Sequence, residues 1–348
     1  MQTKTLIIGG GLSGLALADR LHREKSDFLL VEASDRFGGR IKSATIGGAA
    51  FDLGPAWFWP GQPRLQSLIE RFGLKVFEQH AEGESVVETA DGRVMRGRGY
   101  ASMQGSLRLV GGLGSLITAL VNELPEDKCH LSAPVTALTH TNGEVRADTG
   151  IGSISAQHVV ITAPPRVAAE SIRFSPALPA EANQALQNIP TWMAGHAKVL
   201  AIYDRPFWRQ NGLSGDAMSQ RGPLAEIHDA STTEYGGFAL FGFVGVPADS
   251  RSKLCQSLKQ MAVDQLIRLF GQQAEHPSQL ILEDWAQNSL ISTPADHTNV
   301  GAHPIYGRPP ALNGLWQGAL SFASTEMAEG FGGFMEGALE AGEKLILS

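Results

Sequence analysis

The amino-acid sequence predicts an α/β fold in which two domains share the chain. A short β-branched and apolar run at residues 5–8 stops at three consecutive glycines, and apolar residues then recur at helical spacing over residues 12–21. A second apolar run follows at residues 28–31, which gives the order strand, tight turn, helix, strand. Because 348 residues exceed the usual length of one domain, we expect a second domain beside the one that begins here.

The composition indicates an ordinary globular protein and excludes several kinds of partner. Hydrophobic residues make up 43% of the chain and charged residues 18%, with a formal net charge of −7 and no long Lys/Arg run. Nucleic acid and anionic membranes are therefore disfavoured as partners, and no stretch is apolar enough to span a bilayer. Two cysteines, Cys129 and Cys255, provide neither a disulfide framework nor a metal cluster. We expect a cytoplasmic protein that acts on a small molecule and holds no metal.

The first turn has the glycine spacing of a dinucleotide site. Gly9, Gly11 and Gly14 form G-x-G-x-x-G between the expected strand and helix. The first glycine permits the turn, the second lets a pyrophosphate approach the backbone, and the third lets the helix pack closely on the strand. The N-terminus of the helix, which includes Leu12 and Ser13, offers unpaired N–H groups to phosphate.

An acidic residue follows the second strand where a ribose would need it. Glu32 lies 18 residues after Gly14, and its carboxylate is expected to accept hydrogen bonds from the adenosine ribose hydroxyls, with Ala33 beside it. Gly38 and Gly39 then allow a second close approach of backbone to the ligand. Arg40 follows directly and offers a fork of donors to the pyrophosphate.

The spacing E-x5-GGR after the first strand–helix–strand unit resembles the flavin-containing amine oxidase family. The resemblance implies FAD as the cofactor. It continues in FDLGPAW, residues 51–57, which is similar to the segment that runs beside the isoalloxazine ring in this family. The similarity assigns Gly54, Pro55 and Ala56 to the ring and makes Trp57 an aromatic wall of the substrate pocket. Val135 falls where the backbone of the family brackets the adenine.

A lysine inside an apolar run is the candidate catalytic residue. Residues 195–208 are similar to the substrate sheet of the family, and its characteristic lysine corresponds by position to Lys198. A lysine is costly to bury in so apolar a strand unless it meets water or a partner. The resemblance implies that it holds a water against flavin N5. The alternative is an edge lysine whose amine reaches solvent.

The C-terminal segment carries the last block of the resemblance. Residues 315–346 resemble the family's strand, A-G-T-E-T-A loop and G-Y-M-E-G-A helix. A helix that begins near Gly333 would direct its N-terminal dipole at the pyrimidine edge of the flavin. The resemblance assigns these cofactor-binding residues, of which Ser324 replaces the usual glycine and Phe334 the usual tyrosine: Ser324, Thr325, Glu326, Gly333, Phe334 and Met335.

Three departures from the family pattern affect the expected site. Trp285 aligns with the tryptophan before the covalent attachment site of monoamine oxidases, but no cysteine follows it, so we expect noncovalent FAD. With Phe334 in place of one tyrosine and no tyrosine in the stretch directly after Trp285, the aromatic cage is expected to be incomplete, although Phe334 still belongs to the substrate pocket. Few residues separate Asp52 from Gly111, which predicts a reduced helical cap.

Together these features predict a Rossmann-type FAD-binding domain interleaved with a mixed-sheet substrate domain. The FAD-binding domain is expected from residues 1–55, 106–165 and 310–348, and the substrate domain from residues 56–105 and 166–309. The expected reaction is oxidation of an amine by hydride transfer to flavin N5. Oxygen or another electron acceptor then reoxidises the flavin, and the products are an aldehyde, ammonia and hydrogen peroxide.

Two alternatives stay open from the sequence. One is a flavoprotein with different chemistry, either a desaturase or a renalase-like oxidase of dihydronicotinamides. The other is a binding or scaffold protein that retains FAD with little oxidase activity, which the reduced cap and the incomplete cage would suit.

Overall fold

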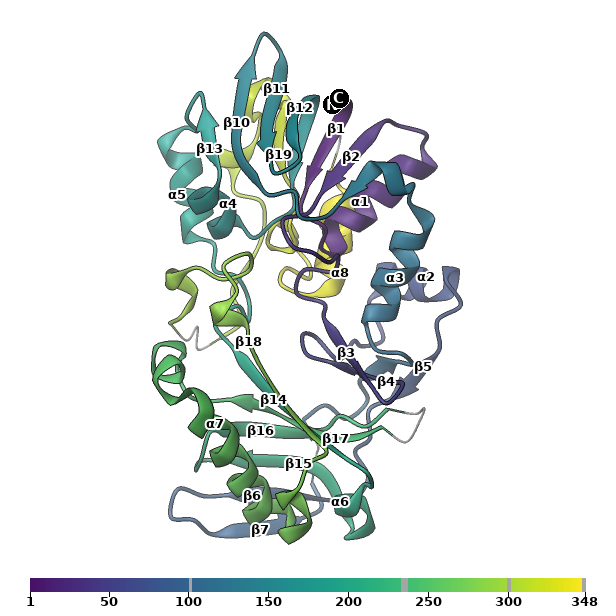
Figure 1. Ribbon diagram of the computed structural model, residues 1–348, viewed down its shortest axis with the longest axis vertical. Helices are drawn as coiled ribbons and strands as arrows, with labels where there is room; N and C mark the ends of the chain where they lie inside the picture. Colours follow the sequence, from purple (N-terminus) through teal and green to yellow (C-terminus); the bar gives the residue numbers. More distant parts are fainter. Residues whose placement is uncertain (100–101, 233–236, 299–301, 346–348) are drawn as a thin grey trace.

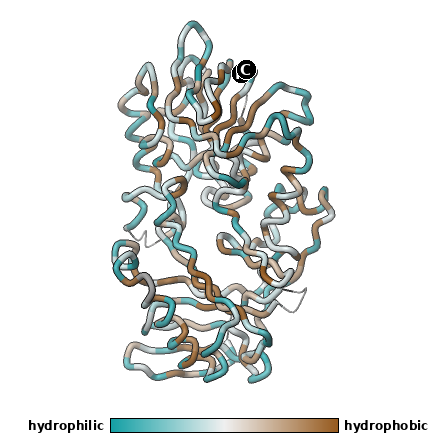
Figure 2. The backbone as a smooth tube through the Cα atoms, in the orientation of Figure 1, coloured by the Kyte–Doolittle hydropathy of each residue, from teal (hydrophilic) through white to brown (hydrophobic). Residues whose placement is uncertain are grey.

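Two large sheets at opposite ends of the molecule determine where a ligand can bind. The computed structural model describes residues 1–99, 102–232, 237–298 and 302–345. One sheet lies at the top of the view in Figure 1 and the other at the bottom, and several segments of the chain run between them. Hydrophobic residues follow the strands of both sheets, whereas the outer loops are mostly hydrophilic (Figure 2).

The first sheet has eight strands among the described residues, in the order β13-β10-β11-β12-β1-β2-β9, with β19 paired to β12. The pairs β1–β2, β1–β12, β2–β9 and β12–β19 are parallel, and β10, β11 and β12 form an antiparallel meander. The bounds of these strands are β1 Gln2–Ile8, β2 Phe28–Val31, β9 Cys129–His130, β10 Val135–Thr141, β11 Glu144–Thr149, β12 Gly152–Ile161, β13 Arg173–Ser175 and β19 Leu320–Phe322.

Helices on both sides of this sheet bury its apolar strands. Strand β2 is buried along its whole length, as expected for a parallel strand covered on both faces. Helix α1 packs against α8 and α3, and these helices share one hydrophobic cluster with β1 and β2. The helices near this sheet are α1 Leu12–Arg23, α2 Pro63–Arg71, α3 Gly114–Glu123, α4 Pro165–Ser171, α5 Ala180–Asn188 and α8 Met335–Glu343.

The second sheet has seven strands among the described residues, in the order β18-β14-β17-β16-β15-β6-β7. All neighbours are antiparallel except β15 and β6. The bounds are β6 Glu84–Glu88, β7 Val94–Gly97, β14 Ala197–Tyr203, β15 Leu213–Ser219, β16 Leu224–Asp229, β17 Phe238–Val244 and β18 Gln279–Asp284. Helix α7, Ala248–Phe270, covers one face of the sheet, and the short helix α6, Phe207–Gln210, lies beside β15 (Figure 1).

Side chains of β14 alternate between the two faces of this sheet. Val199 and Ala201 belong to the cluster that includes residues of α7, whereas Leu200 and Ile202 pack with Phe51 on the opposite face. Since side chains two residues apart in a strand share a face, Lys198 points away from α7, toward the first sheet. The alternation therefore places this lysine in the space between the two sheets.

The region expected to hold a cap is short. Between β4, Ala49–Asp52, and β8, Leu107–Leu109, the described residues form one α-helix, α2. Strand β4 pairs with β3, Ser43–Ile46, and β8 pairs with β5, Val76–Glu78, while β6 and β7 join the second sheet. The predicted α/β class with a reduced helical cap is what the structure has. Among the described helices none is both long and apolar enough to cross a membrane.

The residue limits of the two domains remain a prediction. Strand β13 follows residue 165, the expected end of one segment of the FAD-binding domain, yet it pairs in parallel with β10 of the first sheet. The strands of the second sheet all come from residues 84–97 and 197–284.

Candidate active site

A cavity of about 540 Å³ runs between the two sheets and brings together most of the residues predicted from the sequence. It begins where the parallel strands β1, β2 and β12 end, since Gly9, Glu32 and Thr162 follow these strands and all three line it. This edge of a parallel sheet is where ligands of α/β proteins bind. The predicted residues that line the cavity are Gly9, Gly11, Leu12, Ser13, Glu32, Ala33, Gly39, Arg40, Gly54, Pro55, Ala56, Trp57, Val135, Lys198, Trp285, Thr325, Gly333, Phe334 and Met335.

Three predicted residues, Gly14, Ser324 and Glu326, do not line the cavity. Gly14 lies inside α1, where an added Cβ would come within 1.9 Å of the carbonyl oxygen of Gly9. Its place is therefore the close contact between helix and strand. Ser324 and Glu326 are buried behind Thr325, which does line the cavity.

The start of α1 presents bare backbone to the cavity. Gly11 is the N-terminal cap of the helix, and no side chain caps the first turn. Because the first N–H groups of a helix have no partner within it, they are free to bind an anion. A Cβ placed on Gly11 would approach only the Cα of Gly39, at 4.0 Å, so two glycines face one another across this part of the site.

The carboxylate of Glu32 is held by the loops on either side of it. Glu32 Oε2 accepts a hydrogen bond of 2.6 Å from the backbone N–H of Gly10, and Oε1 accepts one of 2.8 Å from the N–H of Ser34. The side chain is buried at the end of β2 yet lines the cavity. A carboxylate positioned by two backbone donors keeps further lone pairs for a ligand hydroxyl.

Arg40 reaches the cavity from a buried acidic partner. Its Nη1 lies 2.7 Å from Oε1 of Glu326, whose side chain is fully buried. The carboxylate thus balances the positive charge of the guanidinium, and it holds the arginine beside the glycine-rich turn.

Lys198 is buried in the wall of the cavity. Its Nζ donates a hydrogen bond of 2.7 Å to the carbonyl oxygen of Gly54 and a longer one of 3.4 Å to that of Asp52. The amine also lies 4.2 Å from the centre of the Phe241 ring and 5.5 Å from that of Phe243. Burial lowers the pKa of Lys198 to about 7, and the nearby carboxylate of Asp52 opposes this shift only in part.

The alternative reading of Lys198 as an edge lysine is therefore wrong for this structure. The side chain is only 3% exposed, and β14 lies inside the sheet between β17 and β18. A buried amine with a pKa near 7 is partly neutral at physiological pH, and the neutral form can both donate and accept a hydrogen bond.

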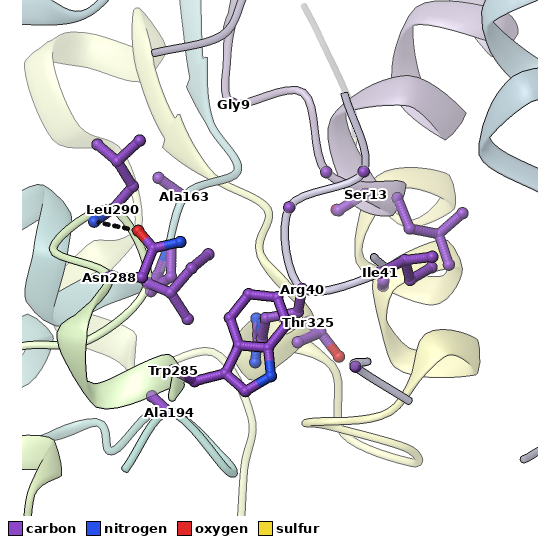
Figure 3. A pocket seen from close by; sticks show the side chains of 18 of the residues that line it. Gly9, Ser13, Arg40, Ile41, Ala163, Ala194, Trp285, Asn288, Leu290 and Thr325 are labelled. Atoms are coloured by element: carbon purple, nitrogen blue, oxygen red, sulfur yellow. Dashed lines mark hydrogen bonds between the residues drawn. The ribbon is translucent and has the colours of Figure 1, made fainter. Parts of the chain in front are cut away.

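Two tryptophans predicted from the sequence line the cavity and are held at their indole nitrogens. Trp57 donates to Oε1 of Gln79 at 2.8 Å, and Trp285 donates to the carbonyl oxygen of Leu53 at 3.2 Å. In Figure 3 Trp285 lies near Ala194, and the dashed line marks the bond of 3.0 Å from the N–H of Leu290 to Asn288 Oδ1. Gly54 packs between Arg40 and Trp285: a Cβ on this glycine would lie 1.9 Å from the carbonyl oxygen of Arg40 and 3.5 Å from Cζ2 of Trp285.

Phe334 has ring neighbours that were not predicted from the sequence. His303 stacks on Phe334 with ring centres 4.8 Å apart and an interplanar angle of 16°. Trp192 meets His303 edge to face, also at 4.8 Å, and lines the cavity as Phe334 does. The tyrosine usual at position 334 is absent, and the ring of His303 stacks on the phenylalanine that replaces it. These neighbours lie in loops far apart in the sequence, and no local pattern marks them.

His196 is a further residue that lines the cavity. It precedes β14 rather than lying in a strand, and its Nδ1 has no hydrogen-bond partner among the described residues. Burial lowers the pKa of His196, and the positive charge of Arg251 lowers it further. Within the described part of the chain, no group of three or more His, Cys, Asp or Glu side chains could hold a metal ion.

Comparison with known proteins identifies the family. Residues 90–344 match the model of the flavin containing amine oxidoreductases, and residues 7–72 match that of an NAD(P)-binding Rossmann-like domain. The chain belongs to the flavin-containing amine oxidoreductase family. It is an FAD-dependent oxidoreductase.

Relatives of this flavoprotein match it over nearly their whole length. A probable flavin-containing monoamine oxidase A of Dictyostelium discoideum is 23% identical, with 97% of this chain and 95% of the relative covered. Putrescine oxidase of Kocuria rosea is also 23% identical, with 99% and 95% covered. The first of these alignments runs over 444 positions, so many residues of the relative have no counterpart in this chain of 348.

Solved structures show the same fold. Putrescine oxidase bound to putrescine superimposes with a TM-score of 0.83 at 21% identity, with 99% of this chain and 98% of that chain covered. Cyclohexylamine oxidase from Brevibacterium oxydans gives a TM-score of 0.83 at 22% identity, with the same coverage. The predicted Rossmann-type architecture of the flavoprotein is confirmed.

The residues of the cavity fit FAD. An elongated cofactor with a pyrophosphate at its centre needs a stretch of bare backbone N–H groups, and the first turn of α1 supplies one opposite Gly39. Glu32 stands at one end of this stretch, and Lys198 lines the cavity on the side of the second sheet.

Proposed function

We propose that this flavoprotein oxidises an amine that carries a C–H bond next to its nitrogen. When bound, FAD supplies the hydride acceptor at its N5 atom. The observation that supports the proposal best is the buried amine of Lys198 in the cavity wall, hydrogen-bonded to Gly54 and only 3% exposed. The family relation and the named relatives, which include monoamine and putrescine oxidases, support the same substrate class.

Lys198 is proposed as the catalytic lysine of this reaction. With a pKa of about 7, the amine exchanges between its neutral and charged forms near physiological pH, so it can hold a water molecule or pass a proton. The Gly54 carbonyl and the rings of Phe241 and Phe243 keep the nitrogen in one place. We propose that the held water faces the cofactor.

The cofactor-binding residues are proposed in three groups along the cavity. The pyrophosphate would meet the N–H groups of the α1 turn and the side chain of Arg40, and the ribose would meet Glu32. Val135 would border the adenine. The ring would lie beside residues 54–57, Thr325 and the N-terminal end of α8, where Gly333 precedes the helix and Met335 begins it. Trp57, Trp285 and Phe334 would be walls that exclude water.

The FAD is proposed to bind without a covalent link. No cysteine lines the cavity within the described residues. Cys129 lies partly buried in strand β9, where burial raises the pKa of its thiol to about 11, and the side chain of Cys255 lies outside the described part of the chain. A protonated thiol at such a position does not act as a nucleophile.

Oxygen is the proposed electron acceptor. Measurement of the products distinguishes this reaction from the alternatives. Holoprotein should be mixed in air with primary amines, and in parallel with dihydronicotinamides, while oxygen, hydrogen peroxide and ammonia are measured. The proposal expects one peroxide and one ammonia per oxygen consumed with an amine. Turnover with dihydronicotinamides and none with amines would replace it by the renalase-like alternative. An artificial acceptor that works where oxygen fails would make the enzyme a dehydrogenase.

A further inference from the structure

The charges around one end of the cavity restrict the substrate. Resting on the amine oxidation proposed above, we infer that the substrate has a single basic nitrogen, and that His196 is the residue that decides this preference. The substrate end of the cavity is the part lined by Trp57, Trp192, His196, Lys198, Phe243 and Phe334.

Acidic side chains line the other end of the cavity. Among the described residues that line it, the carboxylates are Glu32 and Asp35, both in the loop after β2. The titratable side chains of the substrate end are His196 and Lys198. A diamine would bring a second ammonium into this part of the site, and a buried ammonium requires a carboxylate or several acceptors around it.

Three carboxylates near the substrate end are already engaged. Asp284 pairs with Arg251 through two bonds, of 2.7 and 2.9 Å, and Asp296 pairs with Arg166 at 2.5 Å. Asp52 accepts from the hydroxyl of Ser43 at 2.7 Å and from a backbone N–H at 2.9 Å. Releasing any of them toward a ligand would leave a buried donor unpaired.

Basic side chains near His196 supply no counter-charge for a second ammonium. Nη2 of Arg251 donates a hydrogen bond of 2.7 Å to the carbonyl oxygen of Gly195, the residue before His196, and the charge of Arg251 is balanced by Asp284. Lys198 follows two residues after His196, and both side chains line the cavity. A second ammonium in this part of the site would therefore be buried beside basic groups, without a free carboxylate among the described residues of the substrate end.

The walls of the substrate end suit an apolar, flat body. Trp192 and Phe334 line the cavity and are joined by His303, which stacks on one ring at 4.8 Å and meets the other edge to face at 4.8 Å. The ring of Trp192 also lies 6.2 Å from that of His196. Aromatic faces provide contact area for hydrocarbon and aryl groups, and this contact requires no charge on the ligand.

His196 is the position at which one substitution changes this balance. Its Nδ1 is buried and has no partner among the described residues, so the ring is not needed to satisfy another group. His196→Asp would place a carboxylate in the substrate end, close to the basic side chains of Arg251 and Lys198. His196→Asn keeps a neutral polar side chain of similar size and serves as the matched control. His140→Asp makes the same charge change in β10, where His140 stacks on Trp316 outside the cavity.

The experiment compares amines that differ only at the far end. Wild-type holoprotein is mixed anaerobically with hexylamine and with 1,6-diaminohexane, and the rate of flavin reduction is followed over a range of concentrations. Binding alone is measured with analogues that lack the α C–H, through the shift of the flavin absorbance. The inference expects the monoamine to be favoured at least tenfold in reduction rate over dissociation constant, and in binding. His196→Asp should reduce or reverse this preference, whereas His196→Asn and His140→Asp should retain it.

Each outcome separates this inference from the proposed function. A diamine that binds and reduces the wild-type flavin as well as the monoamine, or better, overturns the inference and leaves amine oxidation standing. If neither amine reduces the flavin, nor does any other amine, the proposed function fails and the inference fails with it. If the wild type prefers the monoamine but His196→Asp, folded and loaded with FAD, keeps the full preference, the role of His196 is contradicted.

Discussion

The side-chain nitrogen of Lys198 lies 2.7 Å from the carbonyl oxygen of Gly54. Lys198 belongs to β14 of the seven-stranded sheet, whereas Gly54 follows β4 and packs against the backbone of Arg40 next to the glycine-rich turn. One hydrogen bond therefore connects the two sides of the cavity, and it fixes the amine against a segment assigned to the flavin ring.

Replacement of Lys198 by methionine should slow the enzyme while leaving the flavin bound. Methionine fills much of the same space but cannot hold a water or move a proton, so turnover and flavin reoxidation by oxygen are expected to fall by about 10²-fold. The measurement is stopped-flow absorbance of both half-reactions. Lys259→Met, which removes an exposed lysine from α7, should behave as the wild type. Unchanged rates in Lys198→Met would remove the lysine from the mechanism.

The same substitution should change how stability depends on pH. The folded-state pKa of Lys198 is lowered to about 7 from 10.5, so between these two values the unfolded chain binds more protons than the folded one. The free energy of unfolding of the wild type should therefore rise with pH across this window, by up to a few kcal/mol. Lys198→Met lacks this contribution. The Tm of the variant minus that of the wild type should be largest at pH 7 and smaller at pH 10, and a difference that does not vary with pH would contradict the account.

Gly14→Ala should damage the cofactor site through packing. The added methyl group would lie within 1.9 Å of the carbonyl oxygen of Gly9 and 2.8 Å of the hydroxyl of Thr162, so α1 must shift away from β1. Overpacking of this kind costs about 1–3 kcal/mol, and the first turn of α1 would move with the helix. The expected result is a lower Tm and a smaller fraction of protein purified with FAD. Gly97→Ala is the control, because a Cβ at that glycine meets nothing within 4 Å.

Glu32→Gln should weaken FAD binding more than it weakens the fold. The amide can replace one acceptor bond but loses the charge that strengthens a hydrogen bond to a ribose hydroxyl, a difference of about 1.5–3 kcal/mol. Titration of apoprotein with FAD, followed by flavin fluorescence, should show affinity lower by about tenfold or more. Glu24→Gln, an exposed substitution after α1, should bind as the wild type.

Denaturation should release the flavin intact. If the FAD is noncovalent, acid precipitation leaves all yellow colour in the supernatant, and the mass of the denatured chain equals that calculated from its 348 residues. A pellet that keeps the flavin absorbance, or a chain heavier by the mass of FAD, would show a covalent link to some other residue.

Local patterns in the sequence were enough to predict the strand and helix around the glycine-rich turn. Strand β2 occupies residues 28–31 as predicted, and α1 begins at residue 12 as predicted. The reason is physical: glycine spacing, the helix N-terminus and Glu32 all act within one strand–helix–strand unit. The apolar run around Lys198 likewise predicted a strand, and β14 lies within the predicted range.

Contacts between segments that are distant in the sequence could not be predicted from such local patterns. The parallel pairing of β6 with β15 joins residues 84–88 to residues 213–219, and no periodicity within either run reveals its partner. The rings next to Phe334 are a second case, because His303 stacks on Phe334 and Trp192 meets His303 only after three separate loops are placed. Glu326 matches the family motif and Ser324 replaces its glycine, but the motif does not show that they lie behind Thr325 rather than in the cavity wall.

Oxidation of an amine at the Lys198 end of the cavity is the central claim, and an absorbance spectrum tests it most directly. Purified protein should show flavin bands that correspond to about one FAD per chain. Anaerobic addition of a primary monoamine should bleach them at a rate that agrees with the measured turnover rate. We predict that the bands bleach with an amine and return when air is admitted. Flavin bands that persist with every amine tested, while dithionite still removes them, would contradict the claim and leave a protein that holds FAD without oxidising amines.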